Sequence, residues 1–579
     1  MIKLLRYLKP YKWPLIAVIL LAIGQSVANL YLPTLMSNIV TNGIAKFDTA
    51  YIWRTGIWMV LVTFGGVVCA ILGIYYASQV AVGMTKLIRA ALFDKVQLFS
   101  LNEFDQVSTA SLITRTTNDT TQIQQVMVMI LNLFVTAPIT LVVGVILALN
   151  QDVELSWVLI AILPFLVGTI VFLLIKAVPL FTKMQVKLDK LNLILDENLQ
   201  GVRVIRAFDR IKHEEKRFDD ANIEVTNLAI TVNQLISVMM PVMMFLMNIS
   251  SLAIIWFGSL RVAAGTLDIG AMFAFLQYAI QILLSVLFVA IVFITIPRAE
   301  ASAKRIQEVM DIDPDISDPK KPEKGGKIKG HVEFRNVTFS YHGAEKPALE
   351  NISFVAAPGK VTAIIGGTGS GKSTLVNLIP RFYDVESGAV LVDKIDVRKM
   401  TQAALREKIG LVPQKAILFA GSIKDNLRFG KENATDKEMK RAVEIAQASE
   451  FIEKMPEKMD SVIAQGGTNV SGGQKQRLSI ARALIRKPEI YVFDDTFSAL
   501  DFKTDAKLRM ALKSETKNAT VLIVAQRVST VIDADQIIVL DEGRIVGIGV
   551  HKNLMKSCKV YADIVSSQLS PSEIAKESV

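Results

Sequence analysis

Six long apolar runs fill the first half of the chain and limit its possible folds more than any other feature. The runs lie at residues 14–33, 58–80, 130–149, 155–175, 235–260 and 271–296. A helix needs about 20 apolar residues to cross the hydrocarbon core of a bilayer, and each run has about that length. Because a backbone in lipid must satisfy its own hydrogen bonds, such runs are expected to be helical. We therefore predict an all-α domain with six transmembrane helices over residues 1–310.

The composition agrees with a membrane protein. Of the 579 residues, 51% are hydrophobic, which is high for a soluble protein. The formal net charge of +10 would suit a nucleic acid as partner. Much of the basic excess, however, flanks the apolar runs, where anionic lipid headgroups are the expected partner. We predict contact with a lipid bilayer and no nucleic acid.

The distribution of charge predicts which side of the membrane each connection faces. The segment 179–234 is rich in Lys and Arg, whereas the connection 150–154 has neither and carries Asp152 and Glu154. Cytoplasmic connections carry the excess of positive charge. We therefore predict a multi-pass protein of the cell membrane, with both termini and the second half of the chain in the cytoplasm. Apolar residues recur at helical spacing over 188–205, so the membrane helices are expected to extend into the cytosol.

The span interiors contain neutral polar groups, and no Asp, Glu, Lys or Arg lies near a span centre, which argues against an ion relay. The amide side chains are Gln25, Asn29, Asn248, Gln277 and Gln281. The Met and aromatic side chains of the last two spans are Met239, Met240, Met243, Met244, Phe245, Met247, Phe273, Phe275, Tyr278 and Phe288. Such surfaces adapt to ligands of varied shape, which predicts a pocket for hydrophobic small-molecule substrates. Alternatively, many of these side chains simply face lipid or pack between helices.

The second half of the chain has the composition of a soluble domain. Residues 311–330 are rich in Pro, Gly and charge, which predicts a linker. Strand-like and helix-like segments alternate over residues 331–568, which predicts an α/β domain with a parallel sheet. Its first strand is expected to start at His331, to end at Tyr341 and to lie at a sheet edge. Residues 569–579 are predicted to form a polar tail.

A glycine-rich loop in this domain has the pattern of a phosphate-binding P-loop. It follows an apolar strand at 361–365 and precedes a helix-like segment that starts at Thr374, which is the context that the pattern requires. The loop consists of Gly366, Gly367, Thr368, Gly369, Ser370, Gly371, Lys372 and Ser373. Glycines let the backbone wrap the phosphates, while the lysine reaches the terminal phosphates and the last hydroxyl binds Mg²⁺.

A second segment, about a hundred residues further along the chain, supplies groups for the same site. A glycine turn at 471–474 opens a helical run predicted over 477–485, and the positive end of a helix favours an anion. The apolar residues 490–493 then predict a strand that is buried on both faces. This strand delivers Asp494 and Asp495 to its carboxyl end, which makes Asp494 a candidate metal ligand.

With these motifs the chain resembles the ATP-binding cassette (ABC) transporters, and specifically exporters whose subunit fuses one membrane domain to one cassette. The resemblance covers essentially the whole chain. It implies ATP and Mg²⁺ as cofactors, with Asp494 as the Walker B aspartate and Gln414 as the Q-loop glutamine that contacts Mg²⁺. The further residues that it implies at the nucleotide are Tyr341 on the adenine ring, Thr374, the signature residues Ser471, Gly472, Gly473 and Gln474, and Asp501 in the D-loop.

Two positions depart from the family pattern. Asp495 stands where the family has a catalytic glutamate, and Gln526 stands where it has a histidine. The chain therefore resembles the degenerate-site subunit of bacterial heterodimeric multidrug exporters. The implied partner is a homologous half-transporter with an intact glutamate and histidine. A homodimer with slow hydrolysis, a lipid or peptide exporter, and an ATP-regulated membrane protein without transport remain alternatives.

In this family the cytosolic extensions of the membrane helices end in short coupling helices. The candidates here are residues 101–105 and 206–210. Both lie in basic segments that are predicted to be cytoplasmic. The alternative is that both are ordinary solvated turns.

Overall fold

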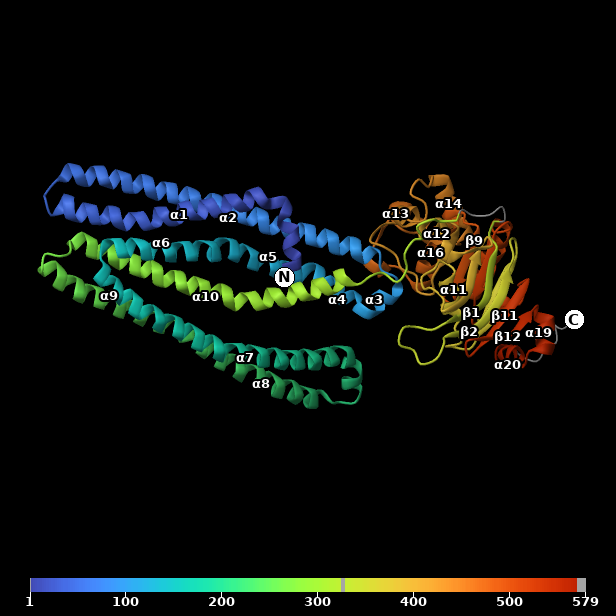
Figure 1. Ribbon diagram of the computed structural model, residues 1–579. Coiled ribbons are helices and arrows are strands. Elements are labelled where there is room, and N and C mark those ends of the chain that lie inside the picture. Colours follow the sequence, from blue (N-terminus) through green and yellow to red (C-terminus); the bar gives the residue numbers. More distant parts are fainter. Residues whose placement is uncertain (1, 324–328, 570–579) are drawn as a thin grey trace. The chain divides into compact units, whose positions relative to one another are not determined.

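The computed structural model describes residues 2–323 and 329–569, and it divides into two compact units (Figure 1). Unit 1 contains Met1–Gln97 and Thr109–Ile312, and unit 2 contains Leu98–Ser108 and Asp313–Val579. The segment Leu98–Ser108 groups with unit 2, although the predicted division assigned it to the membrane domain. Residues 570–579 of the predicted tail and 324–328 of the predicted linker lie outside the described residues.

Unit 1 is built from long helices that run alongside one another (Figure 1). Within the described residues, six helical segments are long and apolar enough to cross a membrane. They are Ile2–Ile44, Thr49–Gln97, Thr109–Gln151, Val153–Ala207, Ile211–Ala263 and Ile269–Asp311. This confirms the predicted all-α domain with six membrane-spanning helices.

These segments are divided where the helical hydrogen bonding changes. The first contains η1 (Ile2–Tyr11), α1 (Lys12–Asn38) and η2 (Ile39–Ile44), and the second is α2 (Thr49–Gln97). The third contains α4 (Thr109–Thr114), η3 (Arg115–Asp119), α5 (Thr120–Met129), η4 (Ile130–Phe134) and α6 (Val135–Gln151). The remaining ones are α7 (Val153–Ala207), α8 (Ile211–Ser237) with α9 (Met239–Ala263), and α10 (Ile269–Asp311).

The helices of unit 1 are held together by apolar packing and by a few polar contacts. Tyr278 of α10 is fully buried, and its hydroxyl lies 2.6 Å from the Thr34 hydroxyl of α1. At the α6–α7 connection, Arg261 of α9 pairs with Asp152 at 2.9 Å and also with Glu154. The acidic connection that the sequence placed outside the membrane is thus fixed by a basic residue about a hundred positions away.

The long helix α7 extends well beyond bilayer length, as the helical spacing over 188–205 predicts. The short coupling helix predicted at 206–210 is wrong. Arg210 N donates to Ile205 O at 2.9 Å and closes the end of α7, so too few residues remain before α8 to form another helix. The other candidate, 101–105, does form a helix, α3 (Leu101–Val107), which begins with a capping box of Ser100 and Glu103.

Unit 2 contains a six-stranded sheet in the order β12-β11-β3-β10-β9-β6 among its described residues. The strands are β3 (Val361–Gly366), β6 (Ile409–Val412), β9 (Ile490–Asp494), β10 (Thr520–Val524), β11 (Gln536–Asp541) and β12 (Arg544–Gly549). All neighbouring pairs are parallel except β11 with β12. Alternate residues of β9 enter different cores, because Tyr491 and Phe493 join one apolar cluster while Ile490 and Val492 join the other. Burial on both faces explains the uninterrupted apolar run.

A second sheet has the order β2-β1-β4-β5. Its strands are β1 (Val332–Phe339), β2 (Leu349–Ala356), β4 (Ser387–Val392) and β5 (Ile395–Asp396), and β7 (Gly421–Ser422) pairs with β8 (Val462–Ile463) in a third. The prediction that β1 is an edge strand is wrong, because β1 pairs with β2 on one side and with β4 on the other. The alternation of apolar residues reports one buried face of a strand and says nothing of its neighbours.

Helices cover the sheets of unit 2 (Figure 1). They are α11 (Lys372–Leu378), η5 (Val397–Lys399), α12 (Gln402–Glu407), α13 (Ile423–Arg428), α14 (Asp436–Ile445), α15 (Ser449–Glu453), η6 (Lys458–Asp460), η7 (Gln465–Gly467), α16 (Gly472–Arg486), α17 (Phe502–Glu515), α18 (Val528–Val531), α19 (His551–Ser557) and α20 (Lys559–Gln568). Together with the mainly parallel sheet they confirm the predicted α/β class of the second half.

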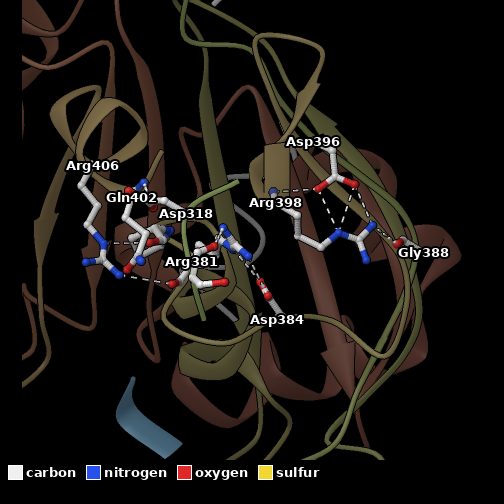
Figure 2. Close-up of polar contacts among 10 residues, drawn as sticks. Asp318, Arg381, Asp384, Gly388, Asp396, Arg398, Gln402 and Arg406 are labelled. Carbon is white, nitrogen blue, oxygen red and sulfur yellow. Dashed lines mark hydrogen bonds and ion pairs between the residues drawn. The ribbon is translucent and has the colours of Figure 1, made fainter. Parts of the chain in front are cut away.

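Asp318 of the predicted linker lies beside residues of unit 2 (Figure 2). Asp318 accepts a hydrogen bond from the Gln402 backbone N–H at 2.9 Å. Arg381, which is paired with Asp384 at 2.7 Å, donates to the carbonyl of Ser317 at 3.3 Å. Residues 317 and 318 of the predicted linker are thus bonded to unit 2.

Candidate functional site

The P-loop connects β3 to α11, as the sequence predicts. Gly371 has φ +95°, and a Cβ at this position would lie 2.7 Å from the Leu349 side chain, so only glycine fits there without strain. The Lys372 ammonium lies inside the loop and donates to the carbonyls of Gly366 at 3.0 Å and Gly367 at 2.6 Å. Burial lowers the pKa of Lys372, while the negative charges of Asp495 and Asp494 raise this pKa and oppose the effect.

A hydroxyl and a carboxylate meet beside this loop. Ser373 donates to Asp494 at 3.0 Å, although the two residues are far apart in the sequence. Burial raises the pKa of Asp494, and the charge of Asp495 raises it further. An Mg²⁺ ion would remove this penalty because it favours the ionised form, and a hydroxyl beside a carboxylate is a typical arrangement for Mg²⁺. The residues present therefore fit the predicted metal.

Asp495 joins three segments of the chain. One of its carboxylate oxygens accepts hydrogen bonds from the Gln414 amide at 3.1 Å and from the Gln526 amide at 2.9 Å. Asp495 is only 7% exposed, and its backbone has φ +45°, a conformation that aspartate tolerates better than most residues. Gln414, predicted to contact the metal, thus donates to this carboxylate.

Sheet topology explains why these three residues meet. Strands β6, β9 and β10 are parallel neighbours, with β9 in the centre. Gln414, Asp495 and Gln526 each follow the carboxyl end of one of these strands. Because the carboxyl ends of parallel strands lie at one edge of the sheet, the three side chains converge.

The signature turn forms the amino end of α16. Ser471 caps this helix in a capping box, because its hydroxyl accepts from Gln474 N at 3.3 Å while Gln474 Oε1 accepts from Ser471 N at 2.8 Å. The helix therefore begins at Gly472 and not at 477 as predicted. The capping box satisfies donors that a helix start otherwise leaves open. Ser471 and Gly472 are exposed and are free to contact another molecule.

The remaining predicted nucleotide residues lie at two other places in unit 2. The Tyr341 hydroxyl is 2.8 Å from the Thr374 hydroxyl, so the aromatic ring lies beside the helix that follows the P-loop. Asp501 instead caps α17 by accepting from Thr504 N at 2.9 Å, which gives its side chain a structural role. Arg527, which the sequence analysis did not single out, donates to Ser498 O at 3.2 Å. Its position directly after Gln526 is the only sequence signal for that contact.

Unit 1 contains a cavity of about 580 Å³ that gathers four of the five predicted amide side chains. Its lining includes Gln25, Asn29, Gln277, Gln281, Ser26, Thr136, Thr140, Ser285, Met36, Met59 and Phe288. Asn248 is not among these residues, and Met243, Phe275 and Tyr278 are buried in helix packing. These three residues therefore pack between helices, as the alternative interpretation held, whereas Met240, Met244, Phe245 and Phe273 are exposed.

Comparisons with known proteins agree with this arrangement. The family model for the ABC transporter transmembrane region matches residues 15–286, and the ABC transporter model matches residues 349–498. An ABC transporter ATP-binding protein of Mycobacterium tuberculosis is 42% identical over 97% of this chain and 97% of its own length. The chain belongs to the ABC transporter family. It is an exporter-type half-transporter, in which a membrane domain is fused to a single ATP-binding cassette, as the resemblance implied.

Other ABC transporters are similar to this chain over most of their length. YfiB of Bacillus subtilis is 39% identical over 98% of both chains. An ATP-dependent lipid A-core flippase of Syntrophus aciditrophicus is 34% identical over 85% of this chain and 81% of its own length. The solved structure of a bacterial Atm1-family ABC exporter with ATP bound superposes with a TM-score of 0.81 at 24% identity, covering 98% of this chain and 99% of that one. This last similarity shows the fold of the half-transporter.

Proposed function

We propose that this ABC half-transporter is the degenerate-site subunit of a heterodimeric, ATP-driven multidrug exporter. It binds ATP at its own P-loop but hydrolyses it slowly. Its signature turn completes the competent site of a homologous partner, which supplies an intact glutamate and histidine. Both termini and the cassette lie in the cytoplasm.

The position of Asp495 is the observation that carries the proposal. A carboxylate that activates water must reach it, and aspartate is one methylene shorter than glutamate. Here the carboxylate is also engaged by Gln414 and Gln526 at 3.1 and 2.9 Å. Both hydrogen bonds go to the same carboxylate oxygen, which leaves that oxygen less free to accept from an attacking water. A carboxylate on a side chain that is one methylene shorter, and that already accepts two hydrogen bonds, is poorly suited to activating water.

Gln526 adds to this effect. A glutamine amide can donate a hydrogen bond to a γ-phosphate, but it cannot become cationic as charge develops in the transition state. Its amide points to Asp495 in this structure. By contrast, the residues proposed to hold phosphates and metal support ATP binding, because Lys372 lies inside the P-loop and Ser373 bonds Asp494. The site therefore keeps the residues for binding ATP and lacks those for fast hydrolysis.

The neutral cavity of unit 1 supports hydrophobic compounds as substrates. Its lining combines amides and hydroxyls with Met36, Met59 and Phe288, and it includes no ionisable side chain. Compounds that are apolar and uncharged, or cations that bind to aromatic faces, suit such a lining. Multiply charged hydrophilic compounds do not.

A lipid exporter is the second candidate. The observation that favours it is the 34% identity to a protein described as a lipid A-core flippase. Vesicles that contain the purified transporter separate the two functions: ATP-dependent accumulation of a lipophilic dye supports drug export, and movement of a labelled lipid without dye uptake supports lipid export. Absence of both would favour an ATP-regulated membrane protein without transport.

The direct test of the degenerate site uses the full chain alone in lipid nanodiscs. We expect it to bind ATP with Mg²⁺ and to turn it over far below the usual enzyme range of roughly 1–1000 s⁻¹. Lys372→Ala is the control that removes binding. Robust turnover by the chain alone would refute the heterodimer proposal.

A further inference from the structure

The last helix of the cassette reaches the segment that carries Gln526. Gln568, the final residue of α20, donates from its amide to the carbonyl of Gln526 at 2.8 Å. Its amide oxygen accepts from the Val528 N–H at 2.8 Å. One side chain thus bonds the backbone on both sides of Arg527. The opposite orientation of the amide would place oxygen against oxygen and nitrogen against N–H, so the two bonds fix the orientation.

These two backbone groups have few alternatives. Val528 is the first residue of α18, and the N–H groups of a first helical turn have no acceptor within their helix. The Gln568 side chain therefore acts as a cap that comes from a distant helix, together with a bond to the preceding carbonyl. A carboxamide provides one donor and one acceptor on the same rigid group, which suits this pair.

The helix that carries Gln568 is well anchored. Tyr561 and Val565 of α20 are almost fully buried in the large apolar cluster of the cassette. The Tyr561 hydroxyl also lies 2.8 Å from His551 Nδ1 at the start of α19. Since α20 cannot shift without exposing these groups, the amide of Gln568 is held at a defined place.

The segment that Gln568 bonds, residues 526–528, carries two side chains that contact the loop after β9. The side chain of Gln526 donates to Asp495 at 2.9 Å, and that of Arg527 donates to Ser498 O at 3.2 Å. The direction of a side chain follows from the backbone that carries it. A shift of the backbone at 526–528 would therefore move both contacts together.

We infer that Gln568 is a positioning residue for ATP hydrolysis in this chain. It acts through the backbone of residues 526–528 and touches neither nucleotide nor metal. Through it, α20 sets where the side chain at position 526 points. The C-terminal helix is thereby a part of the cassette on which the geometry of the hydrolytic residues depends.

The two hydrogen bonds of the Gln568 side chain to the backbone of Gln526 and Val528 are called the clamp below. Hydrogen–deuterium exchange of the full chain in nanodiscs tests this clamp directly. Gln568→Ala removes both bonds, but only the bond from the Val528 N–H protects a backbone amide. We therefore expect exchange at 526–530 to accelerate by about 2- to 12-fold, which is the range for losing one net hydrogen bond. Gln568→Glu keeps the length and the acceptor for Val528 but cannot donate when ionised, so it should give a smaller acceleration. Ser567→Ala is the matched control, because its hydroxyl bonds Ile564 O within α20, and exchange should not change. Equal exchange in the Gln568→Ala and unmodified chains would overturn the inference.

A kinetic arm tests positioning and rests on the proposed function. In a chain with Asp495→Glu and Gln526→His, whose hydrolysis is proposed to rise, we expect Gln568→Ala to lower kcat by about tenfold, since small misplacements of catalytic groups are costly. KM for ATP should change less than twofold, because the P-loop is untouched. A rise in KM of the same size as the fall in kcat would indicate general loosening of the cassette and would overturn the positioning role. If the double variant gains no activity while exchange responds as expected, the clamp is supported and the proposed function is contradicted.

Discussion

Restoring the family residues at the two positions that depart from the pattern tests how the cassette controls hydrolysis. The change is Asp495→Glu together with Gln526→His in the full chain. The longer side chain moves the carboxylate by about 1 Å or more, and a misplacement of about 1 Å corresponds to roughly a hundredfold in rate. Replacing Gln526 also removes the 2.9 Å hydrogen bond that its amide donates to the Asp495 carboxylate. We expect ATP turnover by the isolated chain to rise by about a hundredfold.

The assay is phosphate release at saturating ATP and Mg²⁺ from the chain in nanodiscs. The matched control carries Asp495→Asn with Gln526→His, which adds the histidine without a base and should gain nothing. Position 495 has φ +45°, where glutamate is strained by about 1–2 kcal/mol, so a thermal melt should accompany the assay. A folded double variant that gains less than about tenfold, or that gains no more than the control, would refute the reasoning.

Four further outcomes are expected. Lys372→Ala should lose charge-assisted bonds to phosphate that are each worth about 1.5–3 kcal/mol, so occupancy of this site on trapped complexes should fall and hydrolysis at the partner's site should slow; an unchanged rate with an empty site would exclude a regulatory role. Ser471→Phe should abolish ATPase of the complex, because a large side chain on the signature turn would clash with a nucleotide bound at the partner's P-loop. Retained activity would show that the turn does not complete the partner's site. Gln277→Ala should shift relative transport of different dyes by modest factors without changing basal ATPase, whereas uniform loss for all dyes would point to misfolding. Bonding to Lys431 lowers the pKa of Glu438 to about 2, so its contribution to stability is complete above about pH 4.5 and is lost as the pH falls toward 2; acid unfolding should be less steep in Glu438→Gln, and identical curves would exclude this contribution.

Local patterns in the sequence were sufficient for the architecture. Each apolar run became a membrane-capable helix, because a backbone in lipid has few alternatives. The P-loop appeared between a strand and a helix because Gly371, at φ +95°, permits a turn that other residues resist. The helix after the signature was predicted too short, since Ser471 and Gln474 form their capping box ahead of the apolar periodicity.

Other errors came from information that a local pattern does not contain. The alternation in β1 reported a buried face but not the strands on either side, so the strand was placed at an edge while it lies between β2 and β4. The Pro, Gly and charge of residues 311–330 predicted a linker, but composition did not show that Asp318 and the Ser317 carbonyl bond to the cassette. The sequence of a charged segment is the same whether its side chains face solvent or bond to the domain, and only the fold decides whether a partner is near.

The sequence by itself determined which chemical groups this protein has: a P-loop, a signature turn, two aspartates after a buried strand, and the two departures at 495 and 526. Only the tertiary structure decided what those departures do to each other. The order of the parallel strands places Gln414 and Gln526 on either side of Asp495, and the packing of α20 brings Gln568 to the backbone of Gln526. Hydrogen bonds act over about 3 Å, so residues that are far apart in the sequence interact only where the sheet and the core bring them together.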